Sequence, residues 1–201
     1  MSDCLVIIPT YNEKDNIEDI TRYVLNITAK EFDILVVDDN SPDGTAEIVE
    51  NLMTEFPNRL FIQKRAGKLG LGTAYIHGFK WGLEKNYGYL IEMDADFSHN
   101  PDDLIKLYEA CKNGADVAIG SRYSQGVNVV NWPMSRVLMS YFASVYVRWI
   151  TRMPIRDTTA GFVCYNHHVL RKMKLDKIKF IGYAFQIEMK FRSNCRGFII
   201  Q

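Results

Sequence analysis

Residues 88–96 read GYLIEMDAD, an apolar segment that ends in two carboxylates, Asp94 and Asp96. The segment predicts a buried strand, and side chains two residues apart in an extended chain point to the same side. Two acids on one face at the end of a buried strand repel each other and resist desolvation unless a cation lies beside them. A divalent ion completed by phosphate oxygens fits that chemistry. Solvated loop acids or helix caps are the alternative interpretation of an isolated Asp-x-Asp.

The composition predicts one globular domain of the α/β class. The chain has 201 residues, 47% of them hydrophobic, and its formal net charge is zero. This length supports a real core, and the neutral charge argues against a general nucleic-acid binder. The four cysteines match no metal spacing, and without a signal peptide they are expected to be reduced thiols in a cytoplasmic protein. No uncharged apolar run is long enough to predict a transmembrane helix.

Strand-like apolar runs alternate with helical patterns along the first 120 residues. The strands are expected at 5–8, 32–37, 60–63, 88–93 and 116–120. This alternation predicts a mostly parallel, Rossmann-like sheet flanked by helices, which binds ligands beyond the carboxyl ends of its strands. Three such ends carry acids or turns, at 9–13, 38–39 and 94–96, and their expected convergence supports the metal site.

The second half is less regular. An aromatic-rich helix is predicted from about Met134 to Arg152, a strand at 162–165, a helix at 183–194, and the start of a strand at 198. The first of these helices is either an internal core helix or one that lies among lipid headgroups, with Arg148 and Arg152 near anionic phosphates.

Two familiar phosphate-binding motifs are absent. The turn after the first strand has no glycine, and residues 67–72 lack the Walker order of Gly-Lys followed by Ser or Thr. Lys64, Arg65 and Lys68 near this loop either attract a diphosphate or are simply solvated. His99 is a weak candidate for shaping the site, and the adjacent His167 and His168 are not expected to bind a metal.

Three motifs resemble the signatures of family 2 glycosyltransferases, which have the GT-A fold: Val6–Glu13, Val37–Thr45 and Asp94–Asp96. Further motifs resemble the dolichol-phosphate mannose synthases within that family: Gly70–Tyr75, Asp94–Pro101, Gly120–Tyr123, Asp157–Phe162 and Gly182–Met189. The resemblance spans nearly the whole chain in order, and the motifs are specific together although each alone is weak.

The resemblance implies roles for residues at matching positions. The guanine and ribose of GDP-mannose would be held by Pro9, Tyr11, Glu13, Val37 and Asp39. The diphosphate and Mg²⁺ or Mn²⁺ would be held by Asp94, Ala95 and Asp96. Phosphates of donor or acceptor would be contacted by Arg122, Arg136 and Ser140, with Asp96 and Arg122 as the catalytic residues. Some family members place a metal-contacting glutamine where this chain has Ser98.

The acceptor can be argued from acid–base chemistry. A sugar hydroxyl needs a general base, whereas a phosphate monoester is already anionic at neutral pH. Relatives that use a hydroxyl carry an acidic pair late in the chain, but between residues 161 and 201 the only acids are Asp176 and Glu188. This favours inverting transfer to a dolichyl or polyprenyl phosphate, with Arg136 and Ser140 sharing one helix face.

The expected organisation is a single catalytic domain over 1–201, with a nucleotide-sugar-binding half at about 1–96 and an acceptor-binding half at about 97–201. The second half is expected to be shortened at its C-terminal end relative to the family. The protein is expected to contact the cytoplasmic face of the membrane peripherally. The alternatives are another donor such as UDP-glucose, a hydroxyl acceptor, or a nucleotide-sugar-binding module with little activity.

Overall fold

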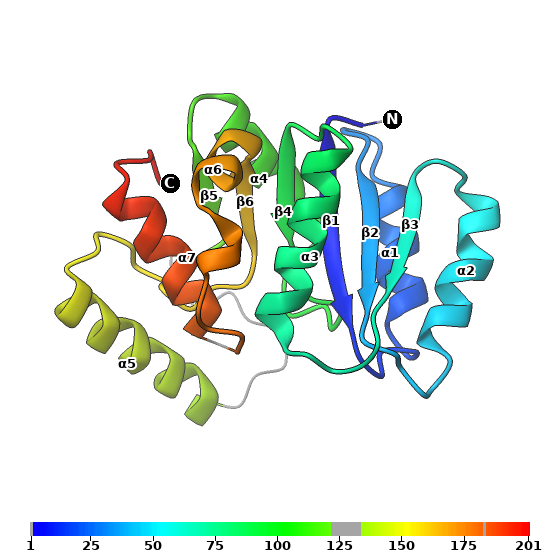
Figure 1. Ribbon diagram of the computed structural model, residues 1–201, viewed down its shortest axis with the longest axis horizontal. Coiled ribbons are helices and arrows are strands. Elements are labelled where there is room, and N and C mark those ends of the chain that lie inside the picture. The colour runs from blue at the N-terminus through cyan, green and yellow to red at the C-terminus, as the bar shows by residue number, and fades with distance from the viewer. Residues whose placement is uncertain (1, 122–133, 183) are drawn as a thin grey trace.

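The computed structural model describes residues 2–121, 134–182 and 184–201, and within them a six-stranded sheet is packed between helices (Figure 1). The strands are β1 (Cys4–Thr10), β2 (Asp33–Asp38), β3 (Leu60–Lys64), β4 (Tyr89–Glu92), β5 (Val117–Ile119) and β6 (Val163–Asn166). The helices are α1 (Ile17–Leu25), α2 (Thr45–Glu55), α3 (Leu71–Glu84), α4 (Asp103–Lys112), α5 (Met134–Thr151), α6 (His167–Lys172), the short 3-10 helix η1 (Leu175–Lys177) and α7 (Ala184–Cys195).

The sheet order is β3-β2-β1-β4-β6-β5, with β1 to β4 parallel. Strand β6 runs antiparallel to both β4 and β5 and lies between them. The mostly parallel α/β sheet predicted from the sequence is therefore confirmed, but the insertion of β6 was not predicted. The carboxyl ends of β1, β2 and β4 lie at one edge of the sheet, the lower edge in Figure 1.

Alternating side chains of each strand build two cores. Val6 and Ile8 of β1 pack with α1, α2 and α4 on one face. Leu5 and Ile7 pack with α3, α6 and α7 on the other. This division follows from the period of two in a strand. Helix α3 lies so close that a Cβ at Gly78 would be 2.6 Å from the Ile7 side chain, so glycine permits the contact.

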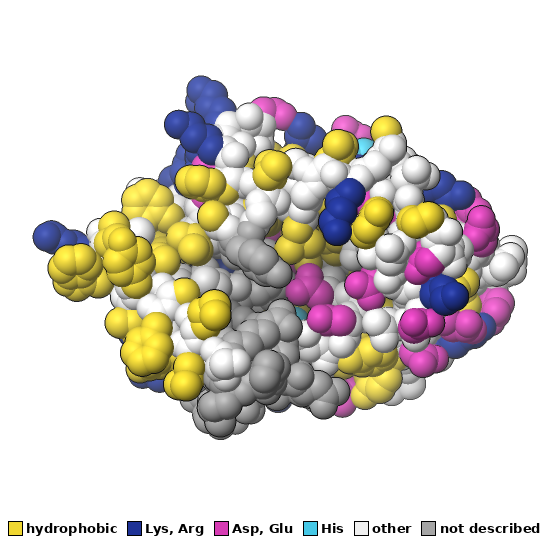
Figure 2. All heavy atoms as spheres, turned by 90° about the horizontal axis from the view of Figure 1, so that it is seen from below, with side chains coloured by type: hydrophobic (Ala, Val, Ile, Leu, Met, Phe, Trp, Pro, Cys, Tyr) yellow, Lys and Arg dark blue, Asp and Glu magenta, His cyan; other side chains and the backbone are white. Residues whose placement is uncertain are grey.

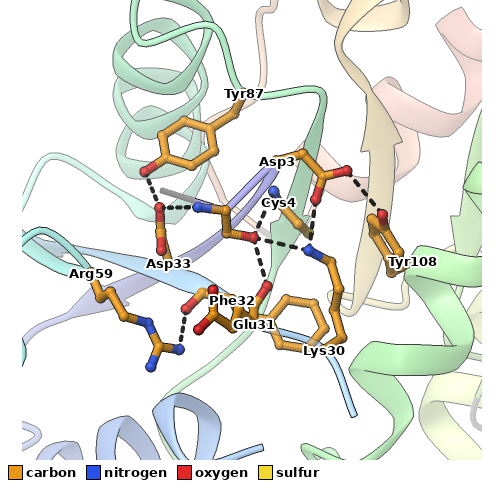
Figure 3. A network of polar contacts seen from close by, with 10 residues as sticks. Asp3, Cys4, Lys30, Glu31, Phe32, Asp33, Arg59, Tyr87 and Tyr108 are labelled. Atoms are coloured by element: carbon orange, nitrogen blue, oxygen red, sulfur yellow. Dashed lines mark hydrogen bonds and ion pairs between the residues drawn. The ribbon is translucent and has the colours of Figure 1, made fainter. Parts of the chain in front are cut away.

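A polar network fixes the opposite edge of the sheet, where β1 and β2 begin (Figure 3). Asp3 accepts hydrogen bonds from Lys30 Nζ at 2.7 Å and from the Tyr108 hydroxyl at 2.9 Å. Asp33 accepts one from the Tyr87 hydroxyl at 2.8 Å. These acids tie the starts of β1 and β2 to α4 and to the turn between α3 and β4, so they are structural.

Helix α5 lies to one side of the sheet (Figure 1) and exposes its large apolar side chains. The exposed ones are Leu138, Met139, Tyr141, Phe142, Tyr146, Trp149 and Ile150. Among the described residues, α5 therefore presents an apolar face at the surface. Within the described ranges, no helix combines the length and hydrophobicity needed to cross a membrane.

The end of the chain begins the strand predicted there. Val117 N donates to Ile199 O at 3.1 Å, and Gln201 N donates to Val117 O at 3.0 Å, so this segment pairs in parallel with β5.

Candidate active site

Asp94 and Asp96 follow β4 at the carboxyl edge of the sheet, and each is oriented by a hydrogen bond. Asp94 is half-buried, and its Oδ1 accepts from the Tyr75 hydroxyl at 3.0 Å. Asp96 is exposed, and its Oδ1 accepts from the Ser98 amide at 3.0 Å. Burial, with the negative charge of Asp94, raises the pKa of Tyr75 well above its ordinary value, so the hydroxyl stays protonated and donates. Ala95 between the acids is buried.

Gly161 lies close to the Asp94 carboxylate. A Cβ built at Gly161 would lie 3.6 Å from Asp94 Oδ2 and 3.9 Å from Gln186 Nε2. The loop before β6 and helix α7 therefore reach the acids at the end of β4, although they lie far away in the sequence. Figure 2, which looks at this edge, shows acidic side chains near the middle of the face.

The residues predicted to hold the nucleoside gather at the ends of β1 and β2. Tyr11 is 37% exposed, and Lys68 Nζ lies 4.3 Å from its ring centroid. Glu13 Oε2 accepts from Asn16 Nδ2 at 3.0 Å. Pro9 is half-buried at the end of β1, and Val37 is completely buried in β2, beneath this surface.

Asp39 forms a buried ion pair with Arg65, which the sequence did not predict. Arg65 Nε donates to Asp39 Oδ1 at 2.6 Å, and Nη1 donates to Thr73 Oγ1 at 2.7 Å. Only 7% and 8% of the two side chains are exposed. Arg65 Nη2 is buried against Asp39 Oδ1, 2.5 Å away, so two nitrogens of the guanidinium face this carboxylate oxygen.

The sheet register could have revealed this pair. Asp38 lies opposite Lys64 at the end of the parallel β2–β3 pairing. The residues that follow the two strands, Asp39 and Arg65, therefore leave the sheet side by side. A solvated Arg65, one of the two interpretations open from the sequence, is incompatible with this burial.

The predicted phosphate-binding residues are only partly described. Arg122 lies outside the described residues, and the side chain of Arg136 on α5 is likewise not described. Ser140 Oγ lies 3.3 Å from Thr159 Oγ1. Thr159 belongs to the loop that includes Gly161, which lies beside Asp94. The contact between Ser140 and Thr159 therefore connects α5 to that loop.

A family model shows where the chain belongs. The model described as Glycosyl transferase family 2 matches residues 5–179. The chain belongs to glycosyl transferase family 2. It is therefore an enzyme of the glycosyltransferase class, as the three motifs indicated.

Curated relatives of this family 2 glycosyltransferase have related names. It is 45% identical over 196 residues to a polyprenol monophosphomannose synthase of Mycolicibacterium smegmatis, covering 98% of the chain and 74% of the relative. It is 46% identical over 189 residues to an undecaprenyl-phosphate mannosyltransferase of Micrococcus luteus, covering 94% and 76%. A dolichol-phosphate mannosyltransferase of Pyrococcus furiosus is 39% identical over 180 residues, covering 87% and 49%.

Solved structures of low sequence identity share the fold. A glucosyl-3-phosphoglycerate synthase of Mycobacterium tuberculosis in complex with UDP superposes with a TM-score of 0.68 at 14% identity, covering 97% of this chain and 66% of that one. A mannosyltransferase of Pyrobaculum calidifontis in complex with GDP-Man and Mn²⁺ gives 0.64 at 16%, covering 99% and 54%. The family 2 glycosyltransferase described here has the GT-A fold, as predicted.

The donor set at Asp94 and Asp96 fits a magnesium or manganese ion. In proteins such ions are commonly held by one or two carboxylates together with substrate phosphates. Among the described residues, no group of three or more acidic, histidine or cysteine side chains could enclose an ion without a substrate.

Two buried titratable side chains lie beneath the site and were missed from the sequence. Glu92 of β4 and Lys190 of α7 are both 0% exposed. Burial raises the pKa of Glu92 to about 8, and the charge of Lys190 opposes that rise. Lys190 Nζ also donates to Ala160 O at 2.6 Å, next to Gly161. The sequence signal that could have revealed Glu92 is that it is the one charged residue within the otherwise apolar run of β4.

His167 and His168, which were not expected to bind a metal, have structural partners. His168 Nε2 lies 2.7 Å from Asp116 Oδ1, and His167 Nδ1 lies 3.3 Å from Gly88 O.

Proposed function

We propose that this protein transfers mannose from GDP-mannose to a polyprenyl phosphate, with inversion at the anomeric carbon. The observation that carries the proposal is the carboxylate pair at the end of β4, oriented by Tyr75 and Ser98 and adjoining the loop from 157 to 161. The names of the relatives at 45% and 46% identity support the sugar and the acceptor. In this proposal residues 1–96 bind the donor and residues 97–201 bind the acceptor.

The Asp39–Arg65 pair supports a guanine base. Guanine carries its N1–H donor next to its O6 acceptor, which matches a carboxylate beside a guanidinium. Adenine presents the opposite order and would meet donor with donor. Uracil offers the same pair of groups, so the experiment below includes a uridine nucleotide.

Asp94 and Asp96 would hold Mg²⁺ or Mn²⁺ in this proposal. The ion, when bound, stabilises the departing diphosphate as a Lewis acid. The chain's own contribution is to fix the two carboxylates. Tyr75 holds the half-buried Asp94, and the Ser98 amide holds the exposed Asp96.

The acceptor phosphate needs no general base, because its oxygen already carries the charge that attacks the anomeric carbon as GDP leaves. The two acids near the end of the chain, Asp176 and Glu188, have structural partners. Glu188 accepts from the backbone amides of Lys179 and Phe180 at 2.8 and 3.0 Å, and Asp176 pairs with Lys80. Burial alone would raise the pKa of Glu188, but these amides and Arg192 bring it below its ordinary value.

Arg122, Arg136 and Ser140 are proposed to bind the phosphate groups of donor or acceptor. Arg136→Ala should raise the acceptor KM or lower kcat while GDP affinity stays unchanged. A large loss of GDP affinity would instead assign Arg136 to the donor site.

The exposed face of α5 is proposed to lie among lipid headgroups at the membrane surface. Trp149 is 79% exposed and Met139 72%. Figure 2 shows apolar side chains gathered on the side of the molecule that carries α5. Aromatic side chains favour this interfacial region, and contact there would bring the site to a lipid-bound acceptor.

A thermal-shift panel with GDP-mannose, GDP and UDP-glucose, each with and without Mn²⁺, tests the donor, and transfer of labelled mannose to polyprenyl phosphate tests the reaction. Metal-dependent stabilisation by guanine nucleotides and a lipid-soluble labelled product are expected. Selective stabilisation by UDP-glucose would contradict the donor. Binding without transfer would leave a nucleotide-sugar-binding module and contradict the proposed reaction.

A further inference from the structure

The turn that follows Asp96 has a strained backbone. Phe97 adopts a φ of +53°, in the left-handed region that residues other than glycine rarely occupy. Such a conformation persists only where its surroundings hold it. The Ser98 amide, immediately after Phe97, is the group that donates to Asp96 Oδ1. The direction of the Asp96 carboxylate therefore depends on whatever holds this turn.

An aromatic stack anchors the far side of the turn. The ring of His99 lies parallel to that of Phe162, with centroids 4.9 Å apart and an interplanar angle of 16°. Phe162 is only 2% exposed, so it offers a fixed surface to the histidine. A parallel stack at this distance is attractive.

Phe162 is itself held against the end of β5. The Gly120 amide donates to Phe162 O at 2.8 Å. A Cβ at Gly120 would lie 2.5 Å from Phe162 Cδ1, so only glycine allows this close approach. The stack thus connects the loop after β4, the end of β5 and the loop before β6, and the loop before β6 brings Gly161 beside Asp94.

We propose that His99 is a positioning residue: its ring, stacked on Phe162, holds the Phe97 turn and so directs the Asp96 carboxylate toward the metal and diphosphate. The inference rests on the proposed function, since it assigns His99 a part in the same site. The role belongs to the flat ring and its packing, not to proton transfer or metal binding by the imidazole. This assignment predicts which substitution is tolerated.

The test compares His99→Ala with His99→Phe, which keeps a flat ring of similar size. Manganese affinity of the GDP complex is measured by electron paramagnetic resonance of free Mn²⁺, and kcat and KM are measured for mannosyl transfer. In His99→Ala, Mn²⁺ should bind about fivefold more weakly, as expected for loss of one aromatic stack, and kcat should fall while metal-free GDP affinity is unchanged. His99→Phe should stay within about twofold of the unmodified protein.

His77→Ala, on α3, is the matched control and should behave like the unmodified protein. Circular dichroism confirms that each variant is folded. Unchanged Mn²⁺ affinity in His99→Ala would overturn the inference, as would a His99→Phe variant as impaired as His99→Ala, which would point to imidazole chemistry. In both cases the unmodified protein still binds Mn²⁺ and GDP, whereas failure of the proposed function would appear as absence of that binding.

Discussion

Replacing Lys190 with methionine removes a buried positive charge with little change in side-chain volume. The charge lies beside Glu92, whose carboxylate is completely buried and has a pKa of about 8. The variant also loses the 2.6 Å hydrogen bond to Ala160 O. Above pH 8, Glu92 is mostly ionised in the unmodified protein. Without the Lys190 charge the pKa of Glu92 rises further, so at pH 9 the folded variant must either bind a proton there or hold an uncompensated buried carboxylate.

The expected loss follows from these two contacts. Removing one partner of a buried ion pair costs about 3–5 kcal/mol of unfolding free energy, and the hydrogen bond adds about 1 kcal/mol. Glu92→Leu should have a similar cost, because it leaves the ammonium buried. The double variant Glu92→Leu/Lys190→Met removes both charges and should lie within about 2 kcal/mol of the unmodified protein, since buried pairs are often replaceable by apolar residues.

Urea unfolding followed by circular dichroism at pH 9 and pH 6 measures these free energies, and the four proteins form a double-mutant cycle. The coupling should be about 3 kcal/mol or more at pH 9. It should be smaller at pH 6, where Glu92 in the folded protein is mainly protonated. Additive losses at pH 9, or equal coupling at both pH values, would refute the charge interaction between Glu92 and Lys190 as the source of the effect.

Three further predictions concern Glu92, Tyr75 and α5. The pKa of Glu92 rises from 4.5 to about 8 on folding, so between these pH values the folded state binds a proton that the unfolded state has lost. The free energy of unfolding should therefore fall by about 1.4 kcal/mol for each unit by which the pH rises from 4.5 to 8. Glu92→Gln should lack this contribution in urea titrations from pH 5 to 8; parallel curves for the two proteins would contradict it. Tyr75→Phe removes the hydrogen bond to Asp94 and should weaken Mn²⁺ binding to the GDP complex about three- to tenfold in the same resonance assay, and unchanged affinity would show that Tyr75 does not orient the ligand. Trp149→Ser with Tyr146→Ser should reduce co-sedimentation with anionic vesicles at least about tenfold, whereas Tyr23→Ser, at an exposed aromatic on α1, should not; equal loss in both would argue against α5 as the contact.

The sheet was predictable because its evidence is local. Apolar runs such as 33–38 and 88–93 are bounded by turn residues, and the acids at their ends identify the carboxyl edge. A local pattern does not reveal which strand lies next to which. Strand β6 pairs with β4 although Val163 lies opposite Glu92 and Asn166 opposite Tyr89, far apart in the sequence, so its antiparallel insertion depends on tertiary packing.

The site residues that lie within sequence motifs could be predicted, whereas the residues that hold them in position could not. Asp94 and Asp96 stand two residues apart, and their chemistry is evident from that spacing. Arg65, Tyr75 and Lys190 act through partners 19 to 30 residues away in sequence. An arginine in a basic loop or a lysine in a helix has the same local appearance whether it is solvated or buried. Only the three-dimensional arrangement identifies the acid or carbonyl that each one meets.

The most direct test of the account is the initial rate of labelled mannose transfer from GDP-mannose to polyprenyl phosphate by the unmodified protein and by Asp96→Ala, with Mn²⁺ present and after chelation. The account predicts a lipid-soluble product that depends on the metal. Asp96→Ala should abolish it while circular dichroism shows an intact fold, because the exposed carboxylate at the end of β4 contributes to the site and not to the core. Undiminished transfer by Asp96→Ala, or transfer that persists without any divalent ion, would contradict the assignment of this carboxylate pair.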